Sequence, residues 1–490
     1  MTDSHEIELK FLCAPADLAA VLAAAPAGDD DTRELISVYF DTPDLDLQKA
    51  GASLRVRESK GRRVQTLKRG AGLAREEHEA PVEGERPDPE LGPLRDLLPE
   101  GGAAALTPSF DVRVTRRQRL IRYGDAQIEL ALDLGEVRDG GRAAPISEVE
   151  LELKAGEPAA LFALARELSH AAPLYLSFDG KASRGQALVA GATVEVRRKE
   201  KIELAKDARV ADAFQAAARN ALGHIAANAA VLREKPTPEA VHQLRVAARR
   251  MRSALSTFAP VVRDKDFATV ASELRWLAKA CDQARELDVL ADEVVEPAAA
   301  LDTPPAGLGV LAGALAGARA RAWSEVSETA ASARFRSLMI EALAWVETGD
   351  WLADPAAAEP ATPFAAKALD KRRRKLLKRG RGLEHASDAA RHRARIQAKK
   401  LRYAAEGFAS LFPDKAVRRF VERLKVLQDR LGTLNDIATA EPLVARLGLP
   451  ADAAFAAGEL VGRRAADKDR LAARAAKALA RLAKVEPFWR

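Results

Sequence analysis

Two patterns of apolar and polar residues divide the chain near residue 205. Before that point, short segments alternate apolar and charged residues at every second position, as in EIELKF at 6–11 and EVELELK at 148–154. A period of two is that of a β-strand with one apolar and one polar face. Beyond that point, long segments rich in Ala, Leu, Arg and Lys repeat their apolar residues every three or four positions, which is typical of amphipathic helices. The pattern therefore predicts a strand-rich first part and an all-helical second part.

Further signals refine this division. In the strand-rich part, the Ala- and Leu-rich stretches at 14–25 and 158–171 predict helices beside the sheet, and in the helical part Pro-rich segments such as 234–239 interrupt the helices. A chain of 490 residues is too long for one core, because a domain averages roughly 150 residues. We therefore expect an α+β multidomain protein, with a first domain at 1–200 and an all-α domain at 206–490.

The helical part contains an internal repeat. A shift of 150 positions lays AVHQLRVAARRMRSALSTFA over ARHRARIQAKKLRYAAEGFA without a gap, so that Phe258 falls on Phe408. Repeats of this kind are the signature of one structural unit used twice. We therefore expect two helical bundles of similar build, repeat one at about 206–296 and repeat two at about 360–490.

The net charge of +6 hides an asymmetry between the two parts. Residues 1–205 carry a formal charge of −8, whereas residues 206–490 carry +14. A strongly basic module favours an anionic partner. The two cysteines, Cys13 and Cys281, lie in different parts, which argues against a disulfide framework and for a reducing compartment. With polar first residues and no apolar run of about 18 residues, we expect a cytoplasmic protein without a membrane span.

The charged residues of the strands are segregated by sign. Arg55 and Arg57 share one face of a strand, whereas Glu148 and Glu150 share one face of another. A solvated sheet face usually mixes both signs, although a solvated face remains the alternative for any single strand. Strands of opposite charge could instead line a closed barrel that holds a polyanion, since carboxylates bind divalent cations and Arg and Lys bind phosphate oxygens.

This constellation resembles the CYTH family, also called triphosphate tunnel metalloenzymes, over residues 1 to about 195. The family's Glu-x-Glu-x-Lys strand is matched by Glu6, Glu8 and Lys10. Its other positions follow in the family's order as Arg55 and Arg57, Lys68, Glu77 and Glu79, Glu129 and Asp133, Glu148, Glu150 and Glu152, and Lys181 and Arg184. The tunnel arginine of DVRVTRRQR is taken as Arg116, with Arg113 as the alternative. Gly180 stands where the family has a serine, so that Ser177 or Ser183 would have to supply the hydroxyl.

The resemblance implies a closed antiparallel β-barrel, the triphosphate tunnel, with flanking helices. It implies metal-dependent hydrolysis of inorganic triphosphate to pyrophosphate and phosphate, with Glu6, Glu8 and Lys10 in catalysis. The divalent metal, Mg²⁺ or Mn²⁺, would be held by Glu6, Glu8, Glu129, Asp133, Glu148, Glu150 and Glu152. Triphosphate would be bound by Lys10, Arg55, Arg57, Lys68, Glu77, Glu79, Arg116, Lys181 and Arg184. Alternatives within the family are a class IV adenylate cyclase and a thiamine-triphosphatase, and a different class is a non-catalytic protein that tethers polyphosphate.

A basic stripe follows one helix in each repeat of the helical part. His242, Arg245, Arg249 and Arg252 stand at i, i+3, i+7 and i+10, and His392, Arg395, Lys399 and Arg402 repeat that spacing, with Arg250 and Lys400 one position over. A solvated charged face is the ordinary explanation of such a helix. However, acidic partners three or four residues away are almost absent, and like charges at these spacings cost stability unless an anion offsets them.

These helices resemble the CHAD domain, an all-helical duplicated module that binds inorganic polyphosphate, over about residues 206–490. The resemblance implies that the ten residues of the two stripes bind polyphosphate. Metal ligation by His242 and His392 is the alternative, but no Cys or second close His supports it. The basic run at 371–381 lacks interleaved aromatic residues, which argues against a nucleic-acid partner. Asp288 and Asp436, which match at a shift of 148, are expected to buttress the arginines or to cap helices.

Overall fold

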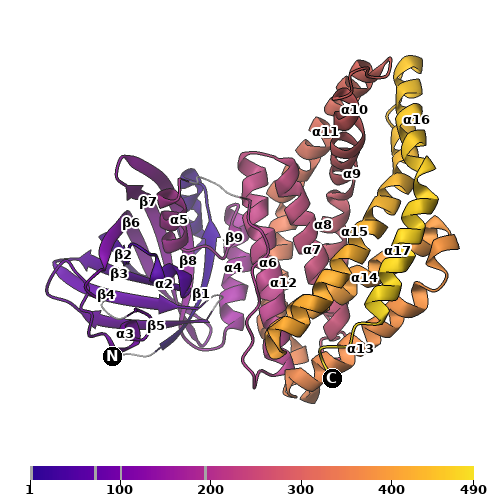
Figure 1. The fold of residues 1–490 in the computed structure, drawn as a ribbon. Coiled ribbons are helices and arrows are strands. Elements are labelled where there is room, and N and C mark those ends of the chain that lie inside the picture. Colours follow the sequence, from indigo (N-terminus) through magenta and orange to yellow (C-terminus); the bar gives the residue numbers. More distant parts are fainter. Residues whose placement is uncertain (1–3, 71–73, 100–101, 192–195) are drawn as a thin grey trace. The chain divides into compact units, whose positions relative to one another are not determined.

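The structure is a computed structural model that describes residues 4–70, 74–99, 102–191 and 196–490, without the side chains of 4–6, 74–75 and 92. The chain separates into two compact units, of which unit 1 comprises Met1–Val196 with Ser332–Thr348 and unit 2 comprises Arg197–Ala331 with Gly349–Arg490. The α+β part of the predicted fold class is confirmed, because an antiparallel sheet precedes a helical region along the chain (Figure 1). Among the described helices, none is long and apolar enough to cross a membrane.

Unit 1 is built around one antiparallel sheet. Its strands run in the order β5-β4-β3-β2-β6-β7-β8-β1-β9, and β1 pairs in addition with β5, Ser4 to Ile7 lying opposite Glu77 to Ala74. The closed barrel stays a prediction, for which this pairing is a supporting observation. The strands are β1 (Ser4–Leu12), β2 (Gly28–Asp41), β3 (Ala52–Ser59), β4 (Arg62–Arg69), β5 (Ala74–Pro81), β6 (Thr107–Tyr123), β7 (Ala126–Asp139), β8 (Arg142–Ala155) and β9 (Tyr175–Ser177).

Apolar side chains of the strands pack on both sides of this sheet. One cluster lies against α3 and includes Phe40, Leu54 and Leu67, whereas another fills the opposite face beside α5 and includes Phe110 and Val137. Alternation along each strand explains the division, because neighbouring residues point to opposite faces. The helices of unit 1 are α1 (Leu18–Ala24), α2 (Asp46–Lys49), α3 (Gly92–Arg95), α4 (Ala159–Ala171), α5 (Lys181–Val189) and α12 (Ala333–Thr348).

Helix α12 departs from the division that the sequence predicts. It lies far along the chain, yet it belongs to unit 1, where it packs against α4 and β9. Arg166 donates from Nε and Nη2 to the two carboxylate oxygens of Glu341, at 2.6 and 2.8 Å, and the guanidinium of Arg336 lies 5.4 Å from the ring centre of Tyr175. A helix whose side chains are apolar nearly all round must be covered by other elements, and α4 covers part of it.

Unit 2 is helical, and the two copies of the repeat meet at its centre. Phe258 packs against Phe214, Phe364 and Phe408, with ring centres 5.2 to 5.5 Å apart. Phe214 and Phe364 correspond in the two repeats, as do Phe258 and Phe408, so equivalent residues build one shared core. The helices are α6 (Val210–Glu234), α7 (Pro238–Phe258), α8 (Phe267–Ala280), α9 (Asp282–Leu290), α10 (Glu296–Ala299), α11 (Leu308–Ala331), α13 (Ala361–Arg379), α14 (Asp388–Gly407), α15 (Asp414–Ala445), α16 (Ala451–Ala466) and α17 (Lys468–Ala483).

Candidate functional site

The strand register brings charged residues together on one face of the sheet of unit 1, which we call the inner face. Lys10 of β1 lies opposite Glu150 of β8. Glu8 lies opposite Glu152, which in turn lies opposite Glu129 of β7. Because side chains alternate along a strand, these residues and their neighbours two positions away share the inner face.

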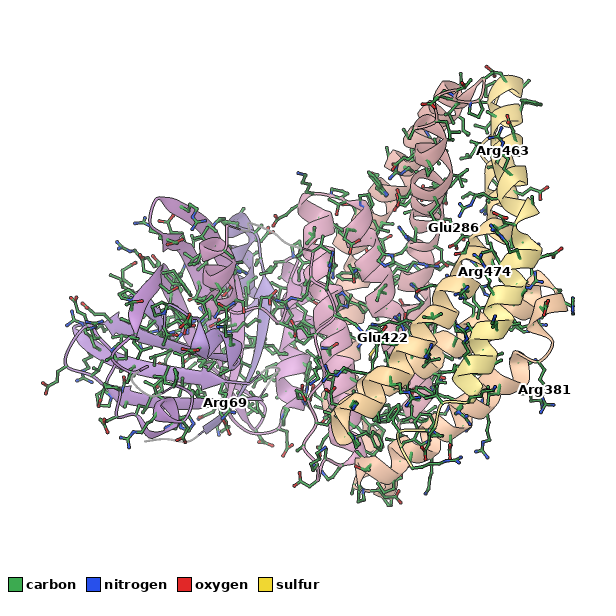
Figure 2. All side chains as sticks on the ribbon, in the orientation of Figure 1. Arg69, Glu286, Arg381, Glu422, Arg463 and Arg474 are labelled. Atoms are coloured by element: carbon green, nitrogen blue, oxygen red, sulfur yellow. The ribbon has the colours of Figure 1, made fainter. Side chains whose placement is uncertain are left out.

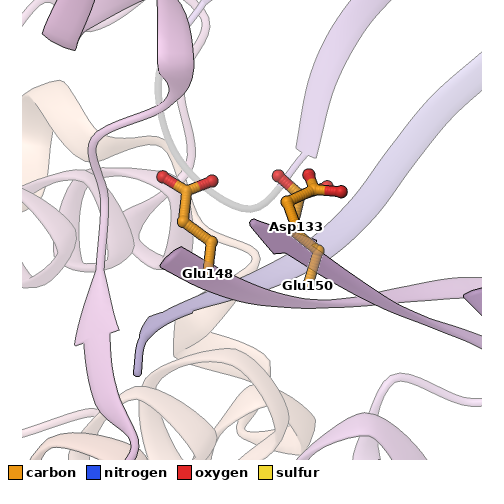
Figure 3. A group of neighbouring side chains, drawn as sticks. All are labelled: Asp133, Glu148 and Glu150. Atoms are coloured by element: carbon orange, nitrogen blue, oxygen red, sulfur yellow. The ribbon is translucent and has the colours of Figure 1, made fainter. Parts of the chain in front are cut away.

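Three carboxylates of the inner face form a compact buried group, the acidic triad, which consists of Asp133, Glu148 and Glu150. One oxygen from each lies within 4.8 Å of the others (Figure 3). The exposed fractions of the three residues are 0%, 1% and 6%. Three charged carboxylates cannot remain this close in a buried place unless cations compensate them.

The compensating cations are Lys181 and Arg116. Lys181, the first residue of α5, places its ammonium 2.6 Å from Asp133 Oδ2, 2.8 Å from Glu148 Oε2 and 2.8 Å from Glu150 Oε1. Arg116 donates from Nε and Nη2 to the two oxygens of Asp133, at 2.7 and 2.6 Å. Burial alone would lower the pKa of Lys181, but the three carboxylates outweigh it and raise that pKa well above its usual value.

Lys10 joins the acidic triad to Glu8. Its ammonium lies 2.5 Å from Glu8 Oε1 and 2.6 Å from Glu150 Oε1. The side chain of Glu6 lies outside the described residues. The structure also separates the two candidates for the tunnel arginine, because Arg116 is on the inner face whereas Arg113 is half-exposed and pairs with Asp111 at 2.9 Å.

Two predicted metal ligands lie apart from the acidic triad. Glu152 pairs with Lys154 at 2.5 Å, and Glu129 lies 4.0 Å from the same ammonium. These side chains are 20 to 37% exposed, in contrast to the acidic triad. The predicted set of seven ligands therefore does not form one cluster among the described residues.

Arginines of β3 give the inner face a positively charged side. Arg55 lies 4.0 Å from Glu77, and its buried Nε has no hydrogen-bond partner. Arg57 donates to Ser37 Oγ at 3.3 Å and forms no ion pair in the described part of the chain. Burial and the neighbouring Arg55 and Arg116 lower the pKa of Arg57 to about 10. A buried guanidinium without a carboxylate is a place where an anionic ligand would bind.

The remaining predicted residues complete this side. Lys68 Nζ lies 3.1 Å from Glu77 Oε2, Glu79 accepts a hydrogen bond of 3.0 Å from Thr66, and Arg184 Nη2 lies 2.8 Å from Glu148 Oε1. Sequence reasoning missed Tyr39 of β2, which is buried beside the arginines. Burial alone would raise its pKa, but Arg55 and Arg57 outweigh it and lower that pKa. The sequence alone gave no signal for it, because its closeness to the arginines depends on the pairing of β2 with β3, in which Tyr39 lies opposite Arg55.

In unit 2, the two basic stripes come together between α7 and α14. Arg249 and Lys399 form no ion pair in the described part of the chain, and the buried Nε atoms of Arg249 and Arg395 have no hydrogen-bond partner. Burial and the neighbouring Arg249, Arg395 and Arg245 lower the pKa of Lys399 to about 6. Burial and its cationic neighbours lower the pKa of Arg249 to about 10. We call Arg245, Arg249, Arg395 and Lys399 the basic cluster.

These groups differ from the many solvated charges of unit 2. Arg463 on α16 and Arg474 on α17 are exposed, as is Arg381 of the run at 371–381 (Figure 2). Among the described residues, Arg245 is the member of the basic cluster that forms an ion pair, with Nε 2.7 Å from Asp282 Oδ1. Repulsion between partly buried cations is costly, and Lys399 reduces it because its lowered pKa lets it release its proton near neutral pH.

The other residues of the stripes have different surroundings. Arg250 pairs with Glu406 at 3.0 Å, and Arg402 lies 3.9 Å from the same carboxylate. Burial and the neighbouring Arg275 lower the pKa of Arg252, and burial with Arg372, Lys375 and Arg252 lowers that of Lys400. Sequence reasoning missed Glu406 and also Tyr403, whose ring lies 5.4 Å from the Arg402 guanidinium.

The two histidines of the stripes are not equivalent. Burial, with a smaller effect of Arg285, lowers the pKa of His242 to about 4, so that its ring is neutral at pH 7. His392 is exposed, and its Nδ1 lies 2.6 Å from Asn435 Oδ1. Of the two predicted aspartates, Asp288 is fully buried and accepts hydrogen bonds of 3.1 Å from Arg319 and Trp323. Asp436 is near enough to favour the charged forms of Arg395 and Lys399.

The acidic triad has the chemistry of a divalent-cation site. Mg²⁺ and Mn²⁺ prefer oxygen ligands, and all three residues offer carboxylates. In addition, the buried Oε1 of Glu148 accepts no hydrogen bond, because the nearby Arg184 is not aligned with it. The residues present therefore fit a divalent metal ion.

Comparison with known proteins assigns both parts of the chain. Residues 4–185 match the family model of the CYTH domain, and residues 216–445 match that of the CHAD domain. An inorganic triphosphatase from Haemophilus influenzae is 33% identical over 194 residues, which cover 38% of this chain and 55% of that relative. This chain thus spans about half the length of that relative.

A solved structure supports the assignment of the helical part. The crystal structure of the CHAD domain from the plant Ricinus communis is 29% identical, covers 58% of this chain and 96% of its own, and superposes with a TM-score of 0.53. The chain therefore carries a CYTH domain at residues 4–185, followed by a CHAD domain at residues 216–445.

Proposed function

We propose that the CYTH domain hydrolyses inorganic triphosphate at the inner face of its sheet, with a divalent metal ion as cofactor. The observation that carries the proposal is that two kinds of buried group lie on the same face of the sheet. These are the acidic triad and the arginines of β3, of which Arg57 forms no ion pair in the described part of the chain and Arg55 has an Nε without a hydrogen-bond partner. The first kind suits a cation and the second suits phosphate oxygens, so together they suit a metal-bound polyanion. The similarity to an inorganic triphosphatase supports the same reaction.

We further propose that the strands close into a tunnel around this site. The pairing of β1 with β5 supports closure. If the short strand β9 is left aside, β5 and β1 are the first and last strands of the sheet, so their pairing joins its two edges. A closed ring would exclude bulk water from the charged groups and would strengthen their interaction with the substrate.

The residues of this chain would share the work of binding and charge stabilisation. Arg55, Arg57 and Lys68 would hold phosphate oxygens and would stabilise the charge that develops as the bridging bond breaks. Lys10, between Glu8 and Glu150, would orient the attacking water or contact a phosphate. Asp133, Glu148 and Glu150 would hold Mg²⁺ or Mn²⁺, with Glu8 adjacent. When bound, the metal ion supplies Lewis-acid polarisation of the phosphoryl oxygens.

The test is phosphate release by the full chain from tripolyphosphate, ATP and thiamine triphosphate, with Mg²⁺ and Mn²⁺ compared. Glu8→Gln keeps the size of the side chain and removes its charge, so kcat should fall by a factor on the order of 100. The matched control is Glu58→Gln, which removes a half-exposed carboxylate paired with Arg63, and should leave turnover unchanged. Wild-type turnover in Glu8→Gln would refute the proposed site.

The substrate comparison separates the enzyme classes. We expect higher kcat/KM on tripolyphosphate than on ATP, because an unsubstituted chain presents a second terminal phosphate to the arginines. Cyclic AMP as the product would point to an adenylate cyclase, and a preference for thiamine triphosphate to a thiamine-triphosphatase. Binding without turnover on all three would leave a non-catalytic tether.

For the CHAD domain we propose binding of inorganic polyphosphate at the basic cluster. The carrying observation is that Arg249, Arg395 and Lys399 are largely buried and lack ion pairs in the described part of the chain. A flexible chain of phosphates would offset their repulsion. The similarity to a solved CHAD domain supports the fold that presents these residues.

The test is a salt titration of polyphosphate binding by the full chain. Arg249→Ala combined with Arg395→Ala should weaken binding and should flatten the slope of log K against log salt by about one unit per lost contact. Arg418→Ala, an exposed arginine on α15, is the control and should change neither. Duplex DNA should compete poorly, because a stiff duplex cannot bring successive phosphates to partly buried cations as a flexible chain can. An unchanged affinity in the double variant would make these helices an ordinary charged surface.

A further inference from the structure

We propose that Lys181 is a resident counter-cation of the acidic triad that a divalent metal ion must displace, so that metal and triphosphate bind cooperatively. This inference rests on the proposed function of the inner face. Displacement would free the Lys181 ammonium for a phosphate while the carboxylates take the metal ion. The metal ion would therefore free an ammonium for the triphosphate, and the triphosphate would hold that ammonium away from the carboxylates that bind the metal ion.

The geometry supports direct competition. The Lys181 ammonium contacts one oxygen from each member of the acidic triad at 2.6 to 2.8 Å, which is the position of a cation shared by three carboxylates. The residue is 8% exposed, so water does not compete strongly for these oxygens. A metal ion bound by the same three oxygens would have to occupy the same space.

The charges around the triad already balance without any ligand. Four carboxylates, from Glu8, Asp133, Glu148 and Glu150, contact four cationic groups, from Lys10, Arg116, Lys181 and Arg184. A divalent cation alone would leave buried positive charge uncompensated. Triphosphate alone would draw the cations away from carboxylates that are then left unpaired. Both states are costly in a buried site, whereas with the two ligands together each freed group meets a charge of opposite sign.

Lys181 is the cation best placed to move. It stands at the start of α5 after the extended Gly180, and its ammonium is a single point charge on four flexible methylenes. Arg116, by contrast, lies opposite Asp133 in the register of β6 and β7 and holds it through two parallel hydrogen bonds. A rotation of the Lys181 side chain can therefore release the triad without disturbing the sheet.

The experiment measures equilibrium binding of Mn²⁺ to the full chain by electron paramagnetic resonance, with and without diimidotriphosphate, whose nitrogen bridges resist hydrolysis. In the wild type, the analogue should tighten Mn²⁺ binding by about tenfold or more, within the usual range of coupling between sites. Lys181→Met removes the competing charge, so Mn²⁺ should bind about tenfold tighter than in the wild type without the analogue, and the coupling should shrink to about twofold or less.

Two further variants keep the test interpretable. Lys181→Arg retains a cation and should bind Mn²⁺ as weakly as the wild type. Lys154→Met removes a lysine that contacts Glu152 outside the triad and should not tighten Mn²⁺ binding. If Lys181→Met fails to fold, as judged by circular dichroism, Lys181→Gln replaces it with the same expected result.

The outcomes separate this inference from the proposed function. Mn²⁺ binding in Lys181→Met that is no tighter than in the wild type overturns the inference. If the wild type still hydrolyses tripolyphosphate in that case, the proposed function stands. If Mn²⁺ and the analogue bind cooperatively through Lys181 but none of the triphosphates is hydrolysed, the counter-cation role stands and the proposed hydrolysis fails.

Discussion

Replacing Asp133 by Asn tests how much the buried charge network contributes to the stability of unit 1. Asp133 is fully buried, accepts two hydrogen bonds from Arg116 and lies 2.6 Å from the Lys181 ammonium. Asn keeps the shape of the side chain but leaves these two cations with one carboxylate fewer. Removing one partner of a buried ion pair costs about 3–5 kcal/mol, because the other partner stays buried and unpaired. We expect a loss of about 3 kcal/mol.

The same strand offers a matched control. Glu129→Gln also removes one negative charge from the inner face of β7, but this carboxylate is 20% exposed and lies 4.0 Å from its partner Lys154. Ion pairs that water reaches contribute roughly 0–1 kcal/mol, so the control should change stability by less than about 1 kcal/mol. Both variants lose one negative charge, so the difference between their losses of stability measures the effect of burial and close pairing at Asp133.

The direction of the Asp133 pKa shift determines how its contribution to stability changes with pH. Burial alone would raise the pKa of Asp133, but Lys181 and Arg116 outweigh it, and the pKa is lowered. A carboxyl group with a lowered folded-state pKa stabilises the protein fully above its unfolded pKa of about 4, and loses that contribution as the pH falls through the folded value. The difference between wild type and Asp133→Asn should therefore be full at pH 7 and should shrink below about pH 4.

Hydrogen exchange followed by mass spectrometry suits this measurement, because a chain with two compact units need not unfold in one step. Peptides that cover β7 and β8 report the opening free energy of unit 1 by itself. A loss of less than about 1 kcal/mol in Asp133→Asn, or an equal loss in Glu129→Gln, would refute the conclusion that the network is tightly paired in solution.

Two further substitutions test single features of the fold. Gly185→Ala on α5 should destabilise unit 1 by about 1–3 kcal/mol in hydrogen exchange, because a Cβ there would lie 2.0 Å from the Phe110 ring, whereas Gly141→Ala, where nothing lies within 4 Å, should be neutral. Lys399→Met should stabilise unit 2 by at least about 1 kcal/mol at pH 7. Burial and cationic neighbours lower the pKa of Lys399 from its usual 10.5 to about 6, so the unfolded chain holds a proton that the folded chain releases. Wild-type stability should rise with pH across that window, and an equal slope in Lys399→Met, measured by hydrogen exchange in α14, would contradict this explanation.

The period-two pattern was enough to predict which face each strand residue occupies, but not which residues meet across strands. Glu148, Glu150 and Glu152 follow one another on the same face of β8, yet only the first two join Asp133, whereas Glu152 lies opposite Glu8 and Glu129. The pairing depends on the register between strands, which is constant for β7 and β8 from Asp139 and Arg142 to Ile128 and Leu153, and one strand's sequence does not by itself encode that register. Sequence therefore predicted the ligand types and faces, whereas the close grouping of Asp133, Glu148 and Glu150 follows from the register, and the larger set of seven ligands stays a prediction.

Packing between elements far apart in the sequence was the second feature that the sequence alone did not predict. The apolar sequence at 333–348 indicates a buried helix, but its neighbours α4 and β9 lie more than 150 residues earlier in the chain. The hydrophobic pattern of a segment indicates that its helix is buried, but it does not indicate which other elements bury it. The contact of Lys181 from α5 with the acidic triad cannot be predicted from local sequence either, because it requires a helix and two strands, β7 and β8, to converge.

The duplicated stripes illustrate how equal sequences acquire different roles. Arg245 and Arg395 correspond in the repeat, but Arg245 forms a 2.7 Å ion pair with Asp282, whose counterpart at the shift of 148 that aligns Asp288 with Asp436 is Arg430. Arg395 forms no ion pair in the described part of the chain, and its buried Nε donates no hydrogen bond there. A bound polyanion gains most from cations that no carboxylate already neutralises, because there it replaces repulsion rather than an existing ion pair. Within the proposed polyphosphate site, the second repeat together with Arg249 therefore supplies the larger share of the attraction, although the spacing of the two stripes is identical.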